Sequence, residues 1–483
     1  MAHSLFSTKP ITELHEAGSA DELNRVLDAR ALVLLGIGAI IGTGIFVLTG
    51  TAAANHAGPA LVLSFVIAGI GCAFAGLCYA EFAAMIPVSG SAYSYSYATL
   101  GEFVAWFVGW NLILEYLFAG ATIAVGWSGY VVSLADQIGL HMPDVLTNAP
   151  FTKGEGHWEL VRTGALVNLP AVLIVCVITA LSYIGIQQSS RFNGVVVAIK
   201  VTVIVLFIGF GAWYVQGANW DPFIPPNEGP GRYGMSGVVT AAGIIFFAYI
   251  GFDAVSTAAQ ETRNPQRNMP IGILVSLAVC TVLYIGVAAV LTGMVPYQEL
   301  NTPAPVAMAL DRYPGLSWLA GWVKMGAIAG MTSTMLVMLL GQPRIFYSMA
   351  KDGLLPPVFG KVHPKFKSPS FSTLLTGVLA AAIAGALPVT ILGELVSIGT
   401  LLAFIVVCIG VLVLRHTRPD LKRPFRVRLP WLVCTLGALI CTYMMISLPK
   451  DTWVRLLVWT FFGMLIYAFY GWKHSALGRP RQG

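Results

Sequence analysis

The stretch GIGAIIGTGIF, residues 36–46, lies in one of the most apolar parts of the chain and decides the fold. Four of its eleven residues are glycines, at positions 36, 38, 42 and 44. Each glycine in a helix interior costs about 1 kcal/mol relative to alanine. A continuous helix would therefore be weakened at its own middle, and the stretch predicts an interrupted helix.

The composition is that of an integral membrane protein. Of 483 residues, 57% are hydrophobic and only 10% are charged, and the mean hydropathy is +0.76. Soluble domains carry about 25% charged residues. Apolar runs of about 20 residues, each long enough to cross a hydrocarbon core of about 30 Å, recur along the chain. We predict an all-α polytopic fold with twelve transmembrane helices, near residues 31–56, 59–86, 101–131, 168–186, 192–215, 236–258, 270–294, 317–341, 370–387, 392–414, 430–448 and 452–472.

The distribution of Lys and Arg predicts the orientation. With the N-terminus inside, 20 of the 28 fall on the cytoplasmic side, 7 on the opposite side, and Lys200 within a span. This bias predicts that both termini are cytoplasmic, so the net charge of +6 indicates topology and no nucleic-acid partner. We interpret the basic run RHTRPDLKRPFRVR, residues 415–428, as a cytoplasmic loop facing anionic lipid. The polar residues 1–30 are expected to be a cytoplasmic segment and not a signal peptide.

Cysteines and histidines give no sign of a disulfide framework, a metal site or an enzyme. All seven cysteines fall in apolar spans, where they behave as small core residues. The eight histidines are scattered, without metal-ligand spacing. The loops offer no cluster of acids or histidines for a polytopic membrane enzyme.

Charged residues inside spans are functional candidates, because each costs about 2.5–3.5 kcal/mol to insert. Glu115, Lys200 and Asp253 lie well inside the third, fifth and sixth spans. Three further acids lie near span ends, and we interpret them as solvated or reaching to the interface: Glu81, Glu102 and Glu394.

A second interruption is predicted in the sixth span, where AYIGFD (residues 248–253) corresponds to IGTGIF (residues 41–46) in the first. Each is followed by a proline-containing boundary and four further spans, which is typical of an inverted-repeat secondary transporter. Unwound backbone at membrane depth is tolerated only where it lines a cavity or binds something. Its N–H groups suit a carboxylate and its carbonyls an ammonium, so the pair of breaks predicts a site for a zwitterion.

A purely structural alternative remains for the glycines, because Gly38 and Gly42 have the spacing of close helix packing. A dinucleotide-binding loop is excluded, since no strand precedes it. The repeat model divides the chain into a cytoplasmic segment (1–30), a first repeat (31–215), a second repeat (216–414), and a last part with a cytoplasmic loop, two helices and the C-terminus (415–483).

Several motifs together resemble the amino acid–polyamine–organocation transporter superfamily, in the bacterial part of its cationic amino acid transporter branch. The resemblance covers nearly the whole chain, and it implies the five-plus-five inverted repeat with broken helices one and six and two extra C-terminal helices. The motifs are weak singly and specific together: GIGAIIGTGIFVLTG (36–50), AGPALVLSF (57–65), PVSGSAYSYSY (87–97), FFAYIGFDAVSTAAQETRNPQRNMPIGI (246–273), YSMAKDGLLPPVF (347–359) and RPDLKRPFRV (418–427).

The resemblance implies a substrate site at the two breaks. It places the substrate carboxylate on backbone amides around Gly42, Thr43 and Gly44, with help from the Thr43 hydroxyl. Phe247 would be an aromatic gate, and Asp253 matches a carboxylate associated with proton sensing. The substrate amine would meet the carbonyls of Ile40, Phe247, Ala248 and Ile250.

Side-chain selectivity is expected to depend on the eighth span. Met338 aligns with a pocket position in relatives, which favours small neutral amino acids such as alanine over arginine; core or lipid packing is the alternative. Glu115 could instead attract a cationic side chain. The tyrosines of YSYSY, at 93, 95 and 97, are expected to anchor an interfacial loop and not to stack on substrate.

Lys200 needs a partner, and no acid lies one turn away on its own helix. An ion pair with Glu115 is one candidate. In relatives, a lysine here reaches the place where sodium-coupled members of the fold hold sodium. The resemblance thus implies bonds to carbonyls near Gly36–Ala39 and to the polar run Thr332, Ser333 and Thr334. It implies proton coupling, with no sodium and no cofactor.

The leading functional hypothesis is a secondary active transporter of the cell membrane that imports L-amino acids with protons. An exchanger is the alternative, including one for cationic amino acids such as arginine or lysine. A nutrient sensor with vestigial transport would need a regulatory partner or extra domain, for which the sequence gives no sign. The expected partners are an amino acid and membrane lipid.

Overall fold

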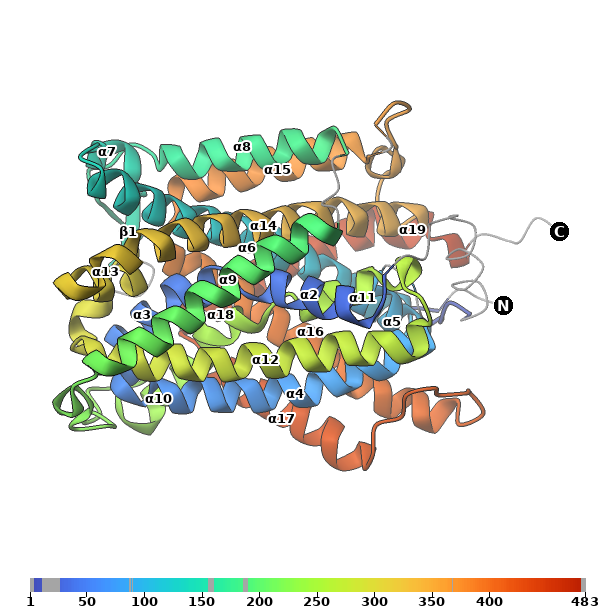
Figure 1. Ribbon diagram of the computed structural model, residues 1–483. Helices are drawn as coiled ribbons and strands as arrows, with labels where there is room; N and C mark the ends of the chain where they lie inside the picture. Colours follow the sequence, from blue (N-terminus) through green and yellow to red (C-terminus); the bar gives the residue numbers. More distant parts are fainter. Residues whose placement is uncertain are drawn as a thin grey trace.

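The computed structural model describes residues 4–10, 27–86, 88, 90–154, 160–185, 190–366 and 368–478. The predicted cytoplasmic segment 1–30 therefore lies largely outside the described residues. In Figure 1 the helices run side by side in one bundle, and both termini lie at the same end. The opposite end carries α7, α13 and a short hairpin of β1 (Phe151–Lys153) and β2 (Leu160–Arg162).

The structure confirms a helical membrane protein. Within the described ranges, nine helical segments are long and apolar enough to cross a membrane, and three apolar helices are shorter (α2, α8 and α15). The α-helices are α2 (Ala29–Ile40), α3 (Thr49–Ala52), α4 (Leu61–Met85), α5 (Ser91–Thr99), α6 (Glu102–Gln137), α7 (Asp144–Thr147), α8 (Leu169–Tyr183), α9 (Ser190–Gly211), α10 (Gly234–Ile245), α11 (Phe252–Thr257), α12 (Pro265–Met294), α13 (Pro305–Asp311), α14 (Ser317–Lys351), α15 (Ser370–Ala386), α16 (Val389–Thr417), α17 (Pro430–Ser447), α18 (Lys450–Ile466) and α19 (Trp472–His474).

The interrupted helices lie at the centre of the bundle. Helix α2 contacts α9, α11, α12 and α14, and the apolar stretch of Gly234–Thr257 is completely buried. By contrast, α17 and α18 present large apolar side chains outward, including Trp431, Phe461 and Phe462. An apolar outer surface suits lipid, and a buried centre suits a site built from backbone groups.

The three acids near span ends are buried and partnered, so the interpretation of them as solvated was wrong. Glu102 accepts hydrogen bonds from Tyr97 and Tyr467 at 2.9 and 3.0 Å, and from Ser475. Glu394 accepts one from Thr452 at 2.8 Å. A buried carboxylate is costly unless its oxygens find partners, and all three accept hydrogen bonds.

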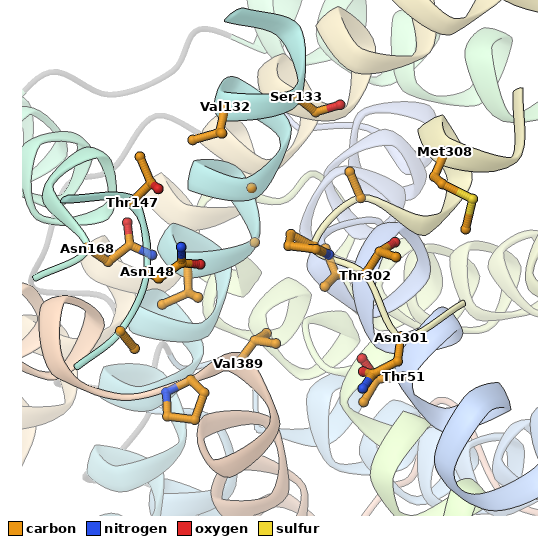
Figure 2. A pocket seen from close by; sticks show the side chains of 18 of the residues that line it. Thr51, Val132, Ser133, Thr147, Asn148, Asn168, Asn301, Thr302, Met308 and Val389 are labelled. Atoms are coloured by element: carbon orange, nitrogen blue, oxygen red, sulfur yellow. The ribbon is translucent and has the colours of Figure 1, made fainter. Parts of the chain in front are cut away.

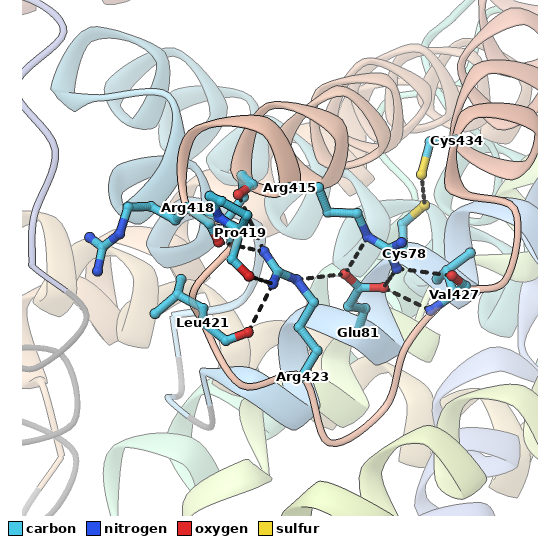
Figure 3. A network of polar contacts seen from close by, with 10 residues as sticks. Cys78, Glu81, Arg415, Arg418, Pro419, Leu421, Arg423, Val427 and Cys434 are labelled. Atoms are coloured by element: carbon cyan, nitrogen blue, oxygen red, sulfur yellow. Dashed lines mark hydrogen bonds and ion pairs between the residues drawn. The ribbon is translucent and has the colours of Figure 1, made fainter.

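Glu81 organises the basic loop between α16 and α17 (Figure 3). Arg415 binds it through two nitrogens, one of them at 3.0 Å, and Val427 N donates to it at 2.8 Å. Arg423 Nε lies 3.5 Å from the same carboxylate. The expectation that run 415–428 faces lipid is therefore wrong for Arg415 and Arg423, which turn inward because Glu81 would otherwise be a buried unpaired charge.

The tyrosines of YSYSY form helix α5, not an interfacial loop, and all three are buried. Tyr95 stacks on Phe82 with ring centroids 5.0 Å apart. Tyr93 donates to Asp352 at 2.7 Å.

Both ends of the described chain meet at Asp352, after α14. Lys9 Nζ lies 2.7 Å from Asp352 Oδ1, and Ala476 N donates to Asp352 O at 3.0 Å. Lys9 N also bonds Tyr97 O at 3.0 Å. The N-terminal segment, residues 4–10, and the last described residues thus close one end of the bundle together.

Candidate functional site

Both predicted helix interruptions are present. Helix α2 ends at Ile40, Ile41 is extended (φ −74°, ψ 103°), and a π-helical turn, η1 (Gly44–Leu48), begins three residues later. Helix α10 is followed by a 3₁₀ turn, η6 (Phe246–Tyr249), an extended Ile250 (ψ 138°), and Gly251 at φ +118° before α11.

The two breaks pack backbone against backbone, and this explains two of their glycines. A Cβ on Gly44 would lie 2.3 Å from Ala248 Cα, and one on Gly251 would lie 2.6 Å from Ala39 O. Close packing extends to Gly38, where a Cβ would lie 2.9 Å from Asn193 Oδ1. The glycines therefore serve close packing as well as the interruption.

The amide side of the break is formed by residues 42–44. Since the first N–H groups of a helix have no preceding turn to accept them, the start of η1 offers donors to an anion. Thr43 is fully buried and does not cap the turn. Its Oγ1 lies 3.5 Å from Ile123 O, which is long for a hydrogen bond, and 3.3 Å from Met331 Sδ, which is a weak acceptor.

The carbonyl side is joined by Tyr284 of α12, a residue that the sequence analysis missed. Its hydroxyl lies 3.0 Å from Ile40 O in the first break and 2.8 Å from Ala248 O in the second. The hydroxyl has one proton, so it can donate to only one of these carbonyls at a time. Phe247 O accepts from Ile250 N at 3.2 Å. Two of the four carbonyls predicted for the amine thus share one donor.

Lys200 is fully buried and reaches the first break. Its Nζ donates to Gly38 O at 2.7 Å, Ile41 O at 3.0 Å and Thr334 Oγ1 at 3.0 Å. These contacts are of the kind that the sequence analysis expected, and within the described residues Lys200 forms no ion pair with Glu115. Its role in coupling stays a prediction.

The polar run of α14 divides between two environments. Thr334 Oγ1 also lies 2.9 Å from both Gly38 O and Ile41 O. Thr332, which was grouped with it, instead accepts from Trp127 at 3.0 Å and donates to Ile328 O at 2.8 Å. Ser333 is buried. Thr334 is therefore a member of the run that bonds Lys200.

The two intramembrane acids are both buried but differ in their partners. Asp253 Oδ1 accepts from Gly251 N at 3.2 Å and its Oδ2 from Tyr116 at 3.0 Å, so it fixes the second break. Neither oxygen of Glu115 has a hydrogen-bond partner within the described residues. Met338 is buried one helical turn beyond Thr334, on the same face of α14.

A cavity of about 760 Å³ opens at the end of the bundle opposite the termini (Figure 2). We call it the vestibule; Asn168, Thr302, Asp144 and Lys324 are among its lining residues. Its floor includes Val47 and Gly126, and a Cβ on Gly126 would lie 2.5 Å from Thr43 Cγ2. The predicted site residues do not line it, although Val47 of η1 does, so the vestibule lies directly beside the first break.

Among the described residues, no group of three or more His, Cys, Asp or Glu side chains is arranged to hold a metal ion. The polar groups at the breaks are backbone amides and carbonyls, the hydroxyls of Thr43, Tyr284 and Thr334, the Asp253 carboxylate and the Lys200 ammonium. Such an arrangement can bind and release a zwitterion.

Comparison with known proteins agrees with this geometry. The family model described as amino acid permease matches residues 27–473. Over 99% of its length the chain is 49% identical to the whole of the methylthioribose transporter of Bacillus subtilis, and 47% identical to the whole branched-chain amino acid permease BcaP of the same organism. A vacuolar cationic amino acid transporter 4 of Arabidopsis thaliana is 39% identical over 86% of this chain and 68% of its own length. The chain therefore belongs to the amino acid permease family, in the bacterial part of the cationic amino acid transporter branch.

Proposed function

We propose that this permease imports a neutral L-amino acid with protons, independently of sodium, through a site formed by the two helix breaks. The observation that carries the proposal is the convergence of three features at Gly38–Gly44: unwound backbone, a second break against it, and the Lys200 ammonium. A fixed ammonium that donates to Gly38 O and Ile41 O occupies the carbonyls that a bound cation would need.

The proposed architecture has twelve crossings in a five-plus-five inverted repeat, followed by two further helices. Supporting it are the nine long and three short apolar helices of the described residues, and breaks in α2–η1 and α10–α11. The bias of Lys and Arg supports cytoplasmic termini, so the vestibule would open outside the cell membrane.

The substrate is proposed to bind with its carboxylate at the amides of Gly42, Thr43 and Gly44 and its amine at the Ile40 and Ala248 carbonyls. The amine would compete with Tyr284 for those carbonyls. Met338 and Phe247 would surround the side chain, which favours an apolar group. One Bacillus relative is named a branched-chain amino acid permease, in keeping with this choice.

A cationic amino acid is the second candidate, and Glu115 favours it. A buried carboxylate without a hydrogen-bond partner is costly, and a guanidinium or ammonium of a substrate would pair with it. The Arabidopsis relative is named a cationic amino acid transporter.

Uptake into proteoliposomes tests the proposal. The purified protein would be offered labelled leucine, alanine, arginine and lysine, with and without an inward proton gradient, in sodium and in potassium buffers. We expect accumulation of a neutral amino acid that needs the proton gradient and is the same in both buffers. A sodium requirement, or countertransport without net proton movement, would contradict proton symport.

The variant Glu115→Gln separates the two substrate classes. If arginine is the substrate and pairs with Glu115, the variant loses arginine uptake. If a neutral amino acid is the substrate, its uptake is the same in the variant and in the wild type.

A further inference from the structure

The vestibule contains hydrogen-bonding groups that the protein itself leaves unused. Asn168 is 3% exposed, and its Oδ1 accepts from Ala171 N at 3.2 Å and from Ser128 at 2.6 Å. Because a backbone N–H can only donate, the atom facing Ala171 is the oxygen. The Nδ2 group is therefore directed elsewhere, and no described residue accepts a hydrogen bond from it.

The opposite wall of the vestibule carries a second unused group. Thr302 Oγ1 is buried and has no hydrogen-bond partner within the described residues. In Figure 2, Thr302 and Asn168 lie on facing walls of the cavity. A buried polar group without a partner costs about 1–3 kcal/mol, so the Thr302 hydroxyl is explained if a polar molecule lies beside it in the cavity. The Asn168 amide faces the same cavity and can donate to that molecule.

The charge of the lining is negative. Among the described lining residues, Asp136, Asp144 and Asp311 contribute three carboxylates, against the single ammonium of Lys324. Lys324 is held in the wall, 2.9 Å from Asp311 and 3.2 Å from Gln137 Oε1, with its side chain 3% exposed. Asp136 contacts the exposed His141 at 3.1 Å, and Asp144 has no cationic partner among the described residues.

From these groups we infer that the vestibule is an outer binding site for the amino acid on its way to the helix breaks, and that it discriminates against acidic side chains. The Asn168 amide and the Thr302 hydroxyl supply donors for the α-carboxylate, and the carboxylates attract the α-ammonium. A second carboxylate on the substrate meets a negative lining whose ammonium already binds Asp311. Clefts lined by one sign of charge focus the field and change association rates by about 10–10³-fold.

The position of the cavity fits this role. Gly126 in its floor packs closely against Thr43, because a Cβ at Gly126 would lie 2.5 Å from Thr43 Cγ2. A molecule in the vestibule thus lies directly beside the first break. The inference rests on the proposed uptake function, with the vestibule facing outward.

Thr302→Val is the most direct test, because the hydroxyl it removes has no partner in the protein and its loss leaves no described group unsatisfied. Asn168→Asp is the companion variant, since it keeps the oxygen that caps α8 and removes the amide donor. Using the neutral amino acid with the highest uptake, we expect either variant to raise KM about 3- to 10-fold with kcat within twofold. Glu228→Gln, on an exposed residue outside the cavity, should leave KM unchanged.

Charge selectivity is measured with the near-isosteric inhibitors L-glutamine and L-glutamate at low ionic strength. In the wild type, glutamate should inhibit uptake at least tenfold more weakly than glutamine. Asp144→Asn should reduce this difference in inhibition between glutamate and glutamine about 3- to 10-fold. In the wild type, 0.5 M salt should also reduce it.

The outcomes separate this inference from the proposed function. If the wild type transports amino acids but KM is unchanged in Thr302→Val and Asn168→Asp, the vestibule is only a water-filled passage and the inference is wrong. If neither Asp144→Asn nor salt changes the ratio of glutamate to glutamine inhibition, the inferred charge selectivity is wrong. If the wild type transports no amino acid, the proposed function fails first.

Discussion

Replacing Lys200 with methionine removes the ammonium and keeps a flexible stem of similar length. In the wild type, that ammonium makes three hydrogen bonds of 2.7–3.0 Å, to Gly38 O, Ile41 O and Thr334 Oγ1. Each of these hydrogen bonds to a charged group contributes about 1.5–3 kcal/mol net to the stability of the folded protein. Removing the charge also removes its desolvation penalty of several kcal/mol, so these two terms largely offset each other.

The remaining loss of stability comes from one backbone carbonyl that has no donor in the variant. Thr334 Oγ1 lies 2.9 Å from both Gly38 O and Ile41 O, but its single proton serves one of them. The other carbonyl is left buried without a donor, at a cost of about 1–3 kcal/mol. We therefore expect Lys200→Met to insert and fold with a modest loss of stability, while accumulation driven by the proton gradient falls to background.

The assay compares uptake at equal protein incorporation, with and without an inward proton gradient. Ile199→Met is the matched control, because the neighbouring side chain on α9 is 42% exposed on the lipid side. It should accumulate substrate as the wild type does. A Lys200→Met variant that still concentrates the amino acid against its gradient would refute the assignment of Lys200 to coupling.

Four further changes test other parts of the structure. Thr43→Val should weaken substrate binding by about 1.5–3 kcal/mol, or about 10- to 150-fold, the value of one hydrogen bond to a charged group; unchanged affinity in a binding assay would count against the carboxylate site. Tyr284→Phe removes the one donor shared by Ile40 O and Ala248 O and should change KM several-fold, whereas Tyr249→Phe, whose hydroxyl bonds Phe65 O, should not. Met338→Ser should extend the competition profile toward longer substrates, and an unaltered profile would place Met338 outside the pocket. Glu81→Gln leaves Arg415 and Arg423 without their carboxylate and should cost about 3–5 kcal/mol in thermal unfolding, against less than about 1 kcal/mol for Asp420→Asn in an exposed pair.

The helix breaks could be predicted because their signal is local. Glycines in an apolar run are unfavourable for a helix, and close packing alone would not place a second such run five spans after the first. The contacts of Lys200 were anticipated from the resemblance to the family. From the residues alone it follows only that a charge in the membrane must find polar groups, which left an ion pair with Glu115 open as well.

Other features could not be predicted because they join distant parts of the chain. Arg415 meets Glu81 across 334 positions, so Glu81 at its span end looked solvated. Tyr284 has no local signal either, because a buried tyrosine hydroxyl generally needs a partner but its position in the sequence does not say which one. The vestibule is built from α6, α7, α13, α14, the start of α16 and the loops near them, and loop packing has no periodic signal in sequence.

The meeting of both chain ends at Asp352 has a consequence for biosynthesis. Lys9 and Asp352 are 343 residues apart, so at about 5–20 residues per second Lys9 waits roughly 17–70 s for its partner to be made. Ala476 and Ser475, which bind Asp352 and Glu102, are made later still. The junction is therefore among the last parts of the molecule that can assemble. A chain that ends before residue 475 can form the Lys9–Asp352 ion pair, but it lacks the Ser475 donor to the buried Glu102 and the Ala476 N–H that bonds Asp352 O, so its junction is left incomplete.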